Sequence, residues 1–260
     1  MGKILKKLLS LDNYFPTRIT TSEEIKTLIK TLRPIETSKS LIRVGPDSDG
    51  GYLLPDDLSN IAKCFSPGVN KESGFEKYCS NMGMSVFMAD GSVEKPVLED
   101  KNFYFTKKYI GATSNENFLT MNDWVSKHSN NNEETLIQMD IEGYEYEVLL
   151  STDPIILNNC RILIVEFHHL DQLWNKMFFN LARSVFEKIL ETHMVVHLHP
   201  NNCCGVENLN SIEIPKVMEF TFYNKRYIDK SCLTKNIPHI LDRCNVPNKP
   251  RINLSEIWFG

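Results

Sequence analysis

Short apolar segments that end in polar or small residues recur along this chain, and helix-like segments separate them. The apolar segments cover residues 61–65, 85–89, 103–110, 135–139, 161–165 and 194–198. The segments 74–82, 121–128, 145–150 and 178–191 instead show the apolar spacing of amphipathic helices. Strands that alternate with helices form a mostly parallel sheet with helices packed on it. The pattern therefore predicts an α/β fold with helices on both faces of the sheet.

The two ends of the chain differ from this alternating region. Residues 21–33 begin with Thr and Ser followed by Glu, which marks the start of a helix. We expect an N-terminal helical segment over residues 1–39, an α/β domain over 40–230 and a C-terminal extension over 231–260 that packs on the domain. Residues 1–11 form a second helical pattern, which we expect to pack on the domain or on a second subunit. Contact with a membrane surface is a less favoured use of that pattern.

Two segments of the domain carry a strand pattern of their own. Residues 40–54 predict two short strands around a tight turn, because Asp49-Gly50-Gly51 supplies the backbone conformations that such a turn needs. A plain surface turn and a turn beside a bound cofactor are both consistent with this pattern. Residues 215–223 alternate between polar and apolar side chains, which predicts a half-exposed terminal strand.

Charge and cysteine usage exclude several classes of protein. The formal net charge of −4 on 260 residues argues against a nucleic-acid-binding protein. No apolar run is long enough for a membrane span. The seven cysteines include no Cys-x-x-Cys pair, so we expect reduced thiols and a cytoplasmic location rather than a disulfide framework. A homo-oligomer remains open.

Polar or small residues follow the predicted strands at the positions where α/β proteins bind ligands. Ligands lie beyond the carboxyl ends of the strands in such sheets. The residues at these positions are Ser66, Gly68, Asp90, Asp140, Glu166, His168 and His199. His197 shares a face with His199 but lies deeper in its strand, where we expect packing. These strand ends therefore predict the cofactor and substrate site.

Gly68 and Asp90 indicate which cofactor the site takes. Asp90 follows Gly68 by 22 positions, and an acidic residue about 20 positions after a strand-end glycine accepts hydrogen bonds from ribose hydroxyls. Dinucleotide sites need more glycines than this turn has, because a pyrophosphate is bound by backbone amides. S-adenosylmethionine has no phosphate and fits a single glycine. A nicotinamide-linked oxidoreductase is the alternative enzyme, and a catalytically silent carbohydrate-binding protein is the alternative without catalysis.

Asp140, Glu166, His168 and His199 are the predicted catalytic residues. Methyl transfer to a hydroxyl needs a base that removes the proton, or a metal ion that polarises the oxygen. Histidine is the favoured base because its pKa lies near neutrality. Asp140, Glu166 and His168 are also the candidate ligands for Mg²⁺ or Mn²⁺. Both versions of the chemistry stay open.

Six motifs in order make the chain resemble the FkbM-type methyltransferases, a class I S-adenosylmethionine-dependent family of bacterial sugar, polysaccharide and natural-product pathways. The motifs are Asp49-Gly50-Gly51-Tyr52, Phe65-Ser66-Pro67-Gly68-Val69, Phe75-Glu76 with Asp90, Met139-Asp140-Ile141-Glu142-Gly143-Tyr144-Glu145, Val165-Glu166-Phe167-His168, and His197-Leu198-His199-Pro200-Asn201-Asn202. The resemblance runs from about Arg43 to about Tyr223.

This resemblance implies a Rossmann-like, seven-stranded sheet over residues 40–230, with residues 215–223 as a late antiparallel strand. It also implies that Gly68 and Asp90 flank the ribose of S-adenosylmethionine, with Glu76 and Asp140 nearby. The complete predicted cofactor-binding set is Asp49, Gly50, Gly51, Tyr52, Ser66, Gly68, Glu76, Asp90 and Asp140. The acceptor that fits the family's pathways is a sugar hydroxyl, on a nucleotide-linked sugar or a surface-polysaccharide precursor.

Overall fold

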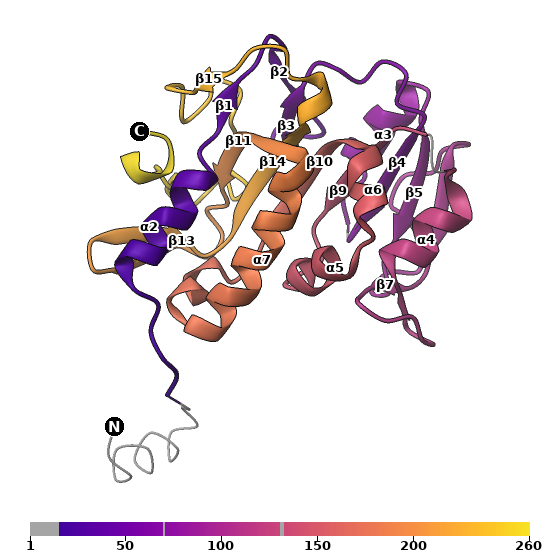
Figure 1. The fold of residues 1–260 in the computed structure, drawn as a ribbon. Helices are drawn as coiled ribbons and strands as arrows, with labels where there is room; N and C mark the ends of the chain where they lie inside the picture. The colour runs from indigo at the N-terminus through magenta and orange to yellow at the C-terminus, as the bar shows by residue number, and fades with distance from the viewer. Residues whose placement is uncertain (1–15, 70, 131–132) are drawn as a thin grey trace.

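A seven-stranded, mostly parallel sheet forms the centre of the molecule (Figure 1). The structure is a computed structural model that describes residues 16–69, 71–130 and 133–260. The strands are β4 (Lys63–Pro67), β5 (Ser85–Ala89), β6 (Phe103–Thr106), β9 (Thr135–Met139), β10 (Cys160–Phe167), β11 (His193–Pro200) and β14 (Met218–Asn224). Their spatial order is β11-β14-β10-β9-β4-β5-β6, and β14 runs antiparallel to both of its neighbours. The α/β prediction with a mostly parallel sheet is confirmed.

Successive side chains of a strand point to opposite faces, so each face of the sheet has its own core. Phe65, Ile137 and Leu163 belong to the first core. The helices that cover this face are α2 (Ser22–Thr31), α4 (Met121–His128), α5 (Glu145–Ser151), α6 (Pro154–Asn159) and α7 (Lys176–Thr192), and Figure 1 shows α5, α6 and α7 in front of the strands. A fully buried large side chain contributes about 1.5–3 kcal/mol to folding, so this core is the main stabilising element.

The second face is covered by one helix and a hairpin. Helix α3 (Gly74–Asn81) packs on β4 and β5. The hairpin of β2 (Leu41–Val44) and β3 (Tyr52–Pro55) is antiparallel as predicted, and β3 crosses β10, β14 and β11. Helices therefore lie on both faces, but α3 covers only the β4–β5 part of the second one.

Several predicted boundaries match the structure and a few do not. The strands at 85–89 and 135–139 and the helix at 121–128 are reproduced to the residue. Helix α2 begins at the expected cap, where the Thr21 hydroxyl and the Glu24 carboxylate form a capping box. The segment 103–110 is not one strand: β6 ends at Thr106, and β7 (Tyr109–Ile110) pairs with β8 (Phe118–Leu119) outside the main sheet.

The half-exposed terminal strand predicted at 215–223 is wrong. Strand β14 is buried along its whole length between β10 and β11, and Pro215 belongs to β13 (Ile212–Pro215), which pairs with β12 (Val206–Leu209). The polar residues that produced the alternation are buried with partners: Thr221 donates to the Leu53 carbonyl oxygen at 2.6 Å. The antiparallel direction of β14 agrees with the expectation from the family resemblance.

The C-terminal segment lies across the β11 side of the domain. Strand β15 (Cys232–Leu233) pairs with β1 (Ile35–Glu36), which follows α2. The 3₁₀ helices are η1 (Leu170–Trp174), η2 (Lys225–Tyr227) and η3 (Glu256–Trp258), and the chain ends beside α2 (Figure 1). Trp258 is fully buried there. The helical pattern at residues 1–11 falls outside the described residues.

No helix in the described part of the chain has the length and apolar character needed to cross a bilayer. All seven cysteines are free thiols, as expected.

Candidate functional site

The predicted site residues lie along the edge where the parallel strands end. The strand order places them in the sequence Asp90, Gly68, Asp140, Glu166, His199 along this edge. Because open α/β sheets bind ligands here, the position suits a cofactor and its substrate.

Two cavities open beside Gly68 and Asp140, and both of these residues line each cavity. The first cavity has a volume of about 340 Å³, and Asp90, Tyr109 and Tyr144 also line it. The second has a volume of about 260 Å³ and is also lined by Asp49, Gly50, Tyr52, Glu72, Glu76 and Gln138. Most of the predicted cofactor-binding residues therefore surround one continuous region of the strand-end edge.

Gly68 is required by the contact between two loops. Its φ of 86° lies in the left-handed region, and a Cβ atom at this position would lie 1.5 Å from the Asp140 carbonyl oxygen. The sequence predicted that Gly68 allows close approach of a ligand. In the structure, the space that a side chain would occupy is filled by the β9–α5 loop, which brings Asp140 into the site.

The turn between β2 and β3 is held beside the second cavity by Arg43. The Arg43 side chain donates to the carbonyl oxygens of Pro46 at 2.9 Å and Ser48 at 2.8 Å. Gly51 is needed at this turn, because a Cβ atom there would lie 2.0 Å from the Pro46 carbonyl oxygen. The exposed Asp49 Oδ1 accepts a hydrogen bond of 2.9 Å from Asn245 in the C-terminal segment.

A chain of hydrogen bonds runs behind the second cavity. Gln138 Nε2 donates to the Tyr52 hydroxyl at 3.0 Å, and the Ser66 hydroxyl lies 2.7 Å from Gln138 Oε1 and 2.5 Å from Glu76 Oε1. Burial raises the pKa of Glu76 to about 7, although Ser66 opposes the shift. When Glu76 is protonated, it can donate to Ser66, Ser66 can donate to Gln138, and Gln138 donates to Tyr52. Ser66 is fully buried within it.

Asp90 lies at the wall of the first cavity. Its Oδ1 accepts hydrogen bonds from the Ser92 backbone amide at 2.7 Å and the Ser92 hydroxyl at 2.6 Å. These bonds hold the carboxylate in one orientation after β5. A fixed carboxylate at this position is the group that ribose hydroxyls need as an acceptor.

Glu145 organises the loop between β9 and α5. It is fully buried, and its Oε1 accepts hydrogen bonds from the backbone amides of Ile141 and Gly143, each at 3.1 Å. The same oxygen lies 3.1 Å from His168 Nδ1. A carboxylate at this distance favours the proton on Nδ1 and leaves His168 Nε2 facing the site.

His168 Nε2 faces three carboxylates. It lies 3.5 Å from Glu142 Oε2, 3.8 Å from Glu166 Oε1 and 3.9 Å from Asp140 Oδ1. Burial lowers the pKa of His168, but the hydrogen bond and charge of Glu145, together with Asp140 and Glu142, raise it overall. The structure therefore brings Asp140, Glu166 and His168 together.

Asp140 and Glu166 lie in a poorly solvated part of the site. Burial raises the pKa of Asp140, whereas the charge of His168 opposes that shift. Burial and the charge of Asp140 raise the pKa of Glu166, whose Oε1 accepts a 2.9 Å hydrogen bond from Asn201. Among the described residues, Asp140 Oδ1 is buried and has no hydrogen-bond partner. A buried polar atom without a partner points to a ligand or an ion at this position.

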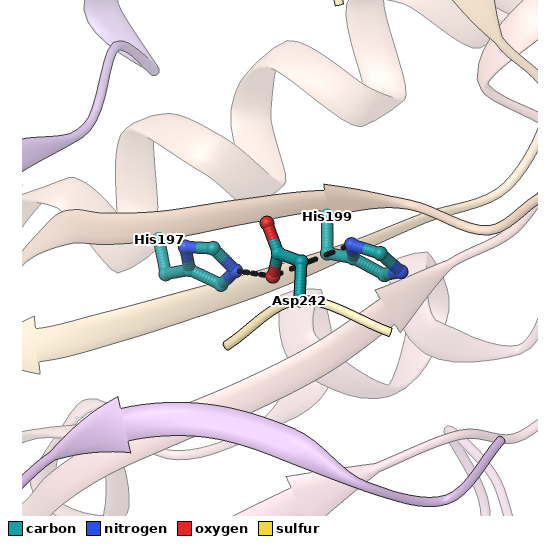
Figure 2. Close-up of side chains that lie close together, drawn as sticks. All are labelled: His197, His199 and Asp242. Carbon is teal, nitrogen blue, oxygen red and sulfur yellow. Dashed lines mark hydrogen bonds and ion pairs between the residues drawn. The ribbon is translucent and has the colours of Figure 1, made fainter. Parts of the chain in front are cut away.

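The structure places His199 apart from the other three predicted catalytic residues. Glu219 of β14 lies between His199 and Glu166 in the sheet register. His199 Nε2 lies 3.1 Å from Asn245 Oδ1, and Nδ1 lies 3.5 Å from Asp242 Oδ1. Figure 2 shows Asp242 between His199 and His197, whose Nε2 is 2.9 Å from Asp242 Oδ1. His197 therefore has a charged partner and does not serve in packing alone.

Four site residues were not predicted from the sequence. Glu145 belongs to a quoted motif but had no assigned role, and its burial follows its position in the first turn of α5. Glu219 lies in a segment whose polar and apolar residues alternate, so nothing in the sequence indicates that this acid is buried. Asp242 and Asn245 lie in a segment without helix or strand periodicity, so no sequence signal links them to β11.

The sequence was compared with known protein families and curated proteins. The family model for the methyltransferase FkbM domain matches residues 41–192, which is more than half of the chain. The chain belongs to the FkbM methyltransferase family. The predicted family is thereby confirmed, and the family identifies the chain as a methyltransferase and implies S-adenosylmethionine as the methyl donor. No curated protein matches the sequence.

Proposed function

We propose that this FkbM-family protein transfers a methyl group from S-adenosylmethionine to a sugar hydroxyl, on a nucleotide-linked sugar or a surface-polysaccharide precursor. Family membership favours a methyltransferase over the oxidoreductase and the silent carbohydrate-binding protein. The antiparallel β14 between β10 and β11 supports a Rossmann-like class I sheet. We assign this domain to residues 40–230, with 1–39 and 231–260 as additions to it.

The observation that carries the proposal is the pair of cavities that meet at Gly68 and Asp140. In the first cavity, Asp90 would accept from the ribose hydroxyls and Tyr109 would pack against the adenine. In the second, Asp49 and Glu72 offer carboxylates to the ammonium group of the methionine part. Asp140, whose Oδ1 has no hydrogen-bond partner among the described residues, lines both cavities and would offer its negative charge to a sulfonium. The donor set therefore fits this cofactor.

The acceptor hydroxyl would lie on the His168 and Glu166 side of Asp140. In the reaction, the acceptor oxygen forms a bond to the methyl carbon while the carbon–sulfur bond breaks, and the sulfur keeps the electron pair. The acceptor proton passes to a base, for which His168 Nε2 is positioned by Glu145. Although burial lowers the pKa of His168, the hydrogen bond and charge of Glu145 raise it overall, and Nε2 acts as the base only while the ring is neutral.

A divalent cation is the second version of the same chemistry. Asp140, Glu142 and His168 place one ligand atom each within 4.8 Å of one another, and Glu166 Oε1 is 3.8 Å from His168 Nε2. Carboxylate oxygens suit Mg²⁺ or Mn²⁺, which would polarise the acceptor hydroxyl. We keep Asp140, Glu166 and His168 as the candidate ligands.

A methyl-transfer screen tests the proposed function. The purified protein, S-adenosylmethionine and a panel of nucleotide-linked sugars are incubated with and without a chelator, and product mass is measured. A methylated sugar supports the proposal. If chelation stops turnover and Mg²⁺ or Mn²⁺ restores it, the metal version holds, and activity in chelator supports His168 as the base. If an amine is methylated and no sugar in the panel is, the proposed sugar acceptor is wrong.

A further inference from the structure

His197, His199 and Asp242 form a side-chain cluster that the proposed methyl transfer does not use. His197 and His199 are two positions apart on β11, so their imidazoles lie on the same face of the strand. Asp242 comes from the C-terminal segment and lies between them (Figure 2). All three residues are buried, with relative exposures of 4%, 6% and 4%.

The geometry of the three ligand atoms is close to that of a metal site. His197, His199 and Asp242 each place one ligand atom within 4.8 Å of those of the other two. Asp242 Oδ1 is 2.9 Å from His197 Nε2 and 3.5 Å from His199 Nδ1. Tetrahedral zinc with bonds of about 2.1 Å places its ligand atoms roughly 3.4 Å apart. Small side-chain movements would therefore complete the site.

The hydrogen bonds around His199 indicate which nitrogen is free to bind an ion. Asn245 Nδ2 donates to Glu219 Oε1 at 2.7 Å and to Asp49 Oδ1 at 2.9 Å, which directs Asn245 Oδ1 toward His199. His199 Nε2 lies 3.1 Å from that oxygen and must donate to it. Nδ1 of His199 therefore faces the carboxylate oxygen of Asp242 and is the nitrogen left to bind an ion.

The surroundings provide further features of a metal site. Second-shell hydrogen bonds orient metal ligands in proteins. Asn245 does this for His199, and the His239 backbone amide donates to Asp242 Oδ2 at 2.7 Å. A cavity of about 240 Å³ is lined by His197 and His239, so it reaches one residue of the cluster. It offers room for a water molecule as a further ligand.

We propose that His197, His199 and Asp242 bind a divalent transition-metal ion that fastens the C-terminal segment to β11. Two imidazoles and one carboxylate suit zinc and its first-row neighbours better than Mg²⁺. The site is separate from the oxygen-rich group of Asp140, Glu142 and His168. Because binding needs residues from both β11 and the C-terminal segment, the ion stabilises the folded chain.

Zinc binding to the full chain tests this proposal. The protein is stripped with a chelator, dialysed and titrated with Zn²⁺ by calorimetry, and its melting temperature is measured at each ratio. We expect about one equivalent of zinc per chain and a rise in melting temperature. In His199→Ala the affinity falls by more than roughly 100-fold, since losing a second-shell partner alone costs 10–100-fold. The melting temperature of this variant no longer responds to zinc.

Two controls make the result specific. Cys204→Ser/Cys232→Ser removes two exposed thiols that are alternative zinc ligands, and His168→Ala disrupts the other candidate group. Both are expected to bind zinc as the parent chain does. If His199→Ala does not fold, His199→Gln replaces it, because its amide can still donate to Asn245. No zinc uptake by the parent chain, or uptake that survives in the His199 variant, overturns the proposal and leaves a protonated His–Asp hydrogen-bond network.

Discussion

The two ends of the polar strand-end edge differ in how their charged groups are satisfied. At the open end, around Gly68, Asp90 and Asp140, two cavities meet, and a buried Asp140 oxygen lacks a hydrogen-bond partner among the described residues. At the covered end, the C-terminal segment brings Asp242 against His197 and His199. A buried oxygen without a hydrogen-bond partner at the open end can receive a cofactor, whereas the buried cluster at the covered end joins the C-terminal segment to β11. The open end therefore suits chemistry and the covered end suits stability.

One residue connects the two ends. Asn245 donates to Asp49, which lines the second cavity, and to Glu219, and it accepts from His199. The effects of substitutions therefore either stay at one end or pass to the other through Asn245.

The largest effect is expected for His168 at the open end. If His168 is the base, His168→Ala lowers turnover by roughly 10²–10⁴-fold, because the acceptor proton loses its positioned acceptor. Binding of S-adenosylhomocysteine stays nearly unchanged, since His168 contacts the acceptor side. Steady-state kinetics with the methylated sugar measure this. His169→Asn, at an exposed neighbour with φ of 58°, is the matched control and keeps full turnover. Equal activity in both variants would remove His168 from the reaction.

At the covered end, Asp242→Asn is expected to destabilise the metal-free protein by about 3 kcal/mol, because it removes the charge between two buried histidines. Urea unfolding in chelator measures the free energy of unfolding. Asp229→Asn changes an exposed acid that accepts from Ser38 and should lower the free energy of unfolding far less. Cofactor affinity should not change in either variant. A large loss of cofactor affinity in Asp242→Asn would show that Asn245 couples the two ends and that they are not independent.

Glu76, behind the second cavity, gives a pH-dependent effect of similar or smaller size. Its pKa of about 7 in the folded chain exceeds the ordinary value of 4.5, so its contribution to stability is fully present below pH 4.5 and is lost as the pH rises through 7. The shift corresponds to about 3 kcal/mol at most. Glu76→Gln mimics the protonated acid, so the variant should gain about 1–3 kcal/mol over the parent chain at pH 8 and little near pH 5.

Urea unfolding at a series of pH values measures the difference for Glu76→Gln. The exposed Glu147→Gln serves as the control and should show no such trend. A difference that is constant from pH 5 to pH 8 would mean that Glu76 is not protonated in the folded chain. A difference that grows with pH would show that the open end retains a group whose ionisation lowers the free energy of unfolding.

Much of the fold could be predicted because its signals are local. Strand β9 is a continuous apolar run, and α4 combines a Thr120 cap with apolar spacing, so both were located to the residue. The exposure of β14 was predicted wrongly because it depends on residues that are distant in the sequence. Glu219 and Thr221 look like solvent-facing residues, yet they are bonded to Asn245 and to the Leu53 carbonyl oxygen.

The same distinction holds for the site. A parallel strand delivers its last residues to the ligand-binding edge, so the residues after β9 and β10 could be selected by position alone. An antiparallel strand delivers its first residues to that edge, and the rule therefore missed Glu219. Asp242 reaches the edge through a segment without periodic structure. His199 lies beside Asp242 and not beside His168 because this segment places Asp242 there. The spacing of residues along the sequence does not indicate that contact.

The cofactor site is tested most directly by calorimetric binding of S-adenosylhomocysteine to the parent chain and to Asp90→Ala. We expect one bound ligand per chain, no binding of NAD⁺, and a loss of about 1.5–3 kcal/mol in the variant, or roughly tenfold or more in affinity. Asp56→Ala, at an exposed position after β3, should bind as the parent chain does. Equal affinity in Asp90→Ala and the parent chain would contradict the assignment of the open end as the cofactor site.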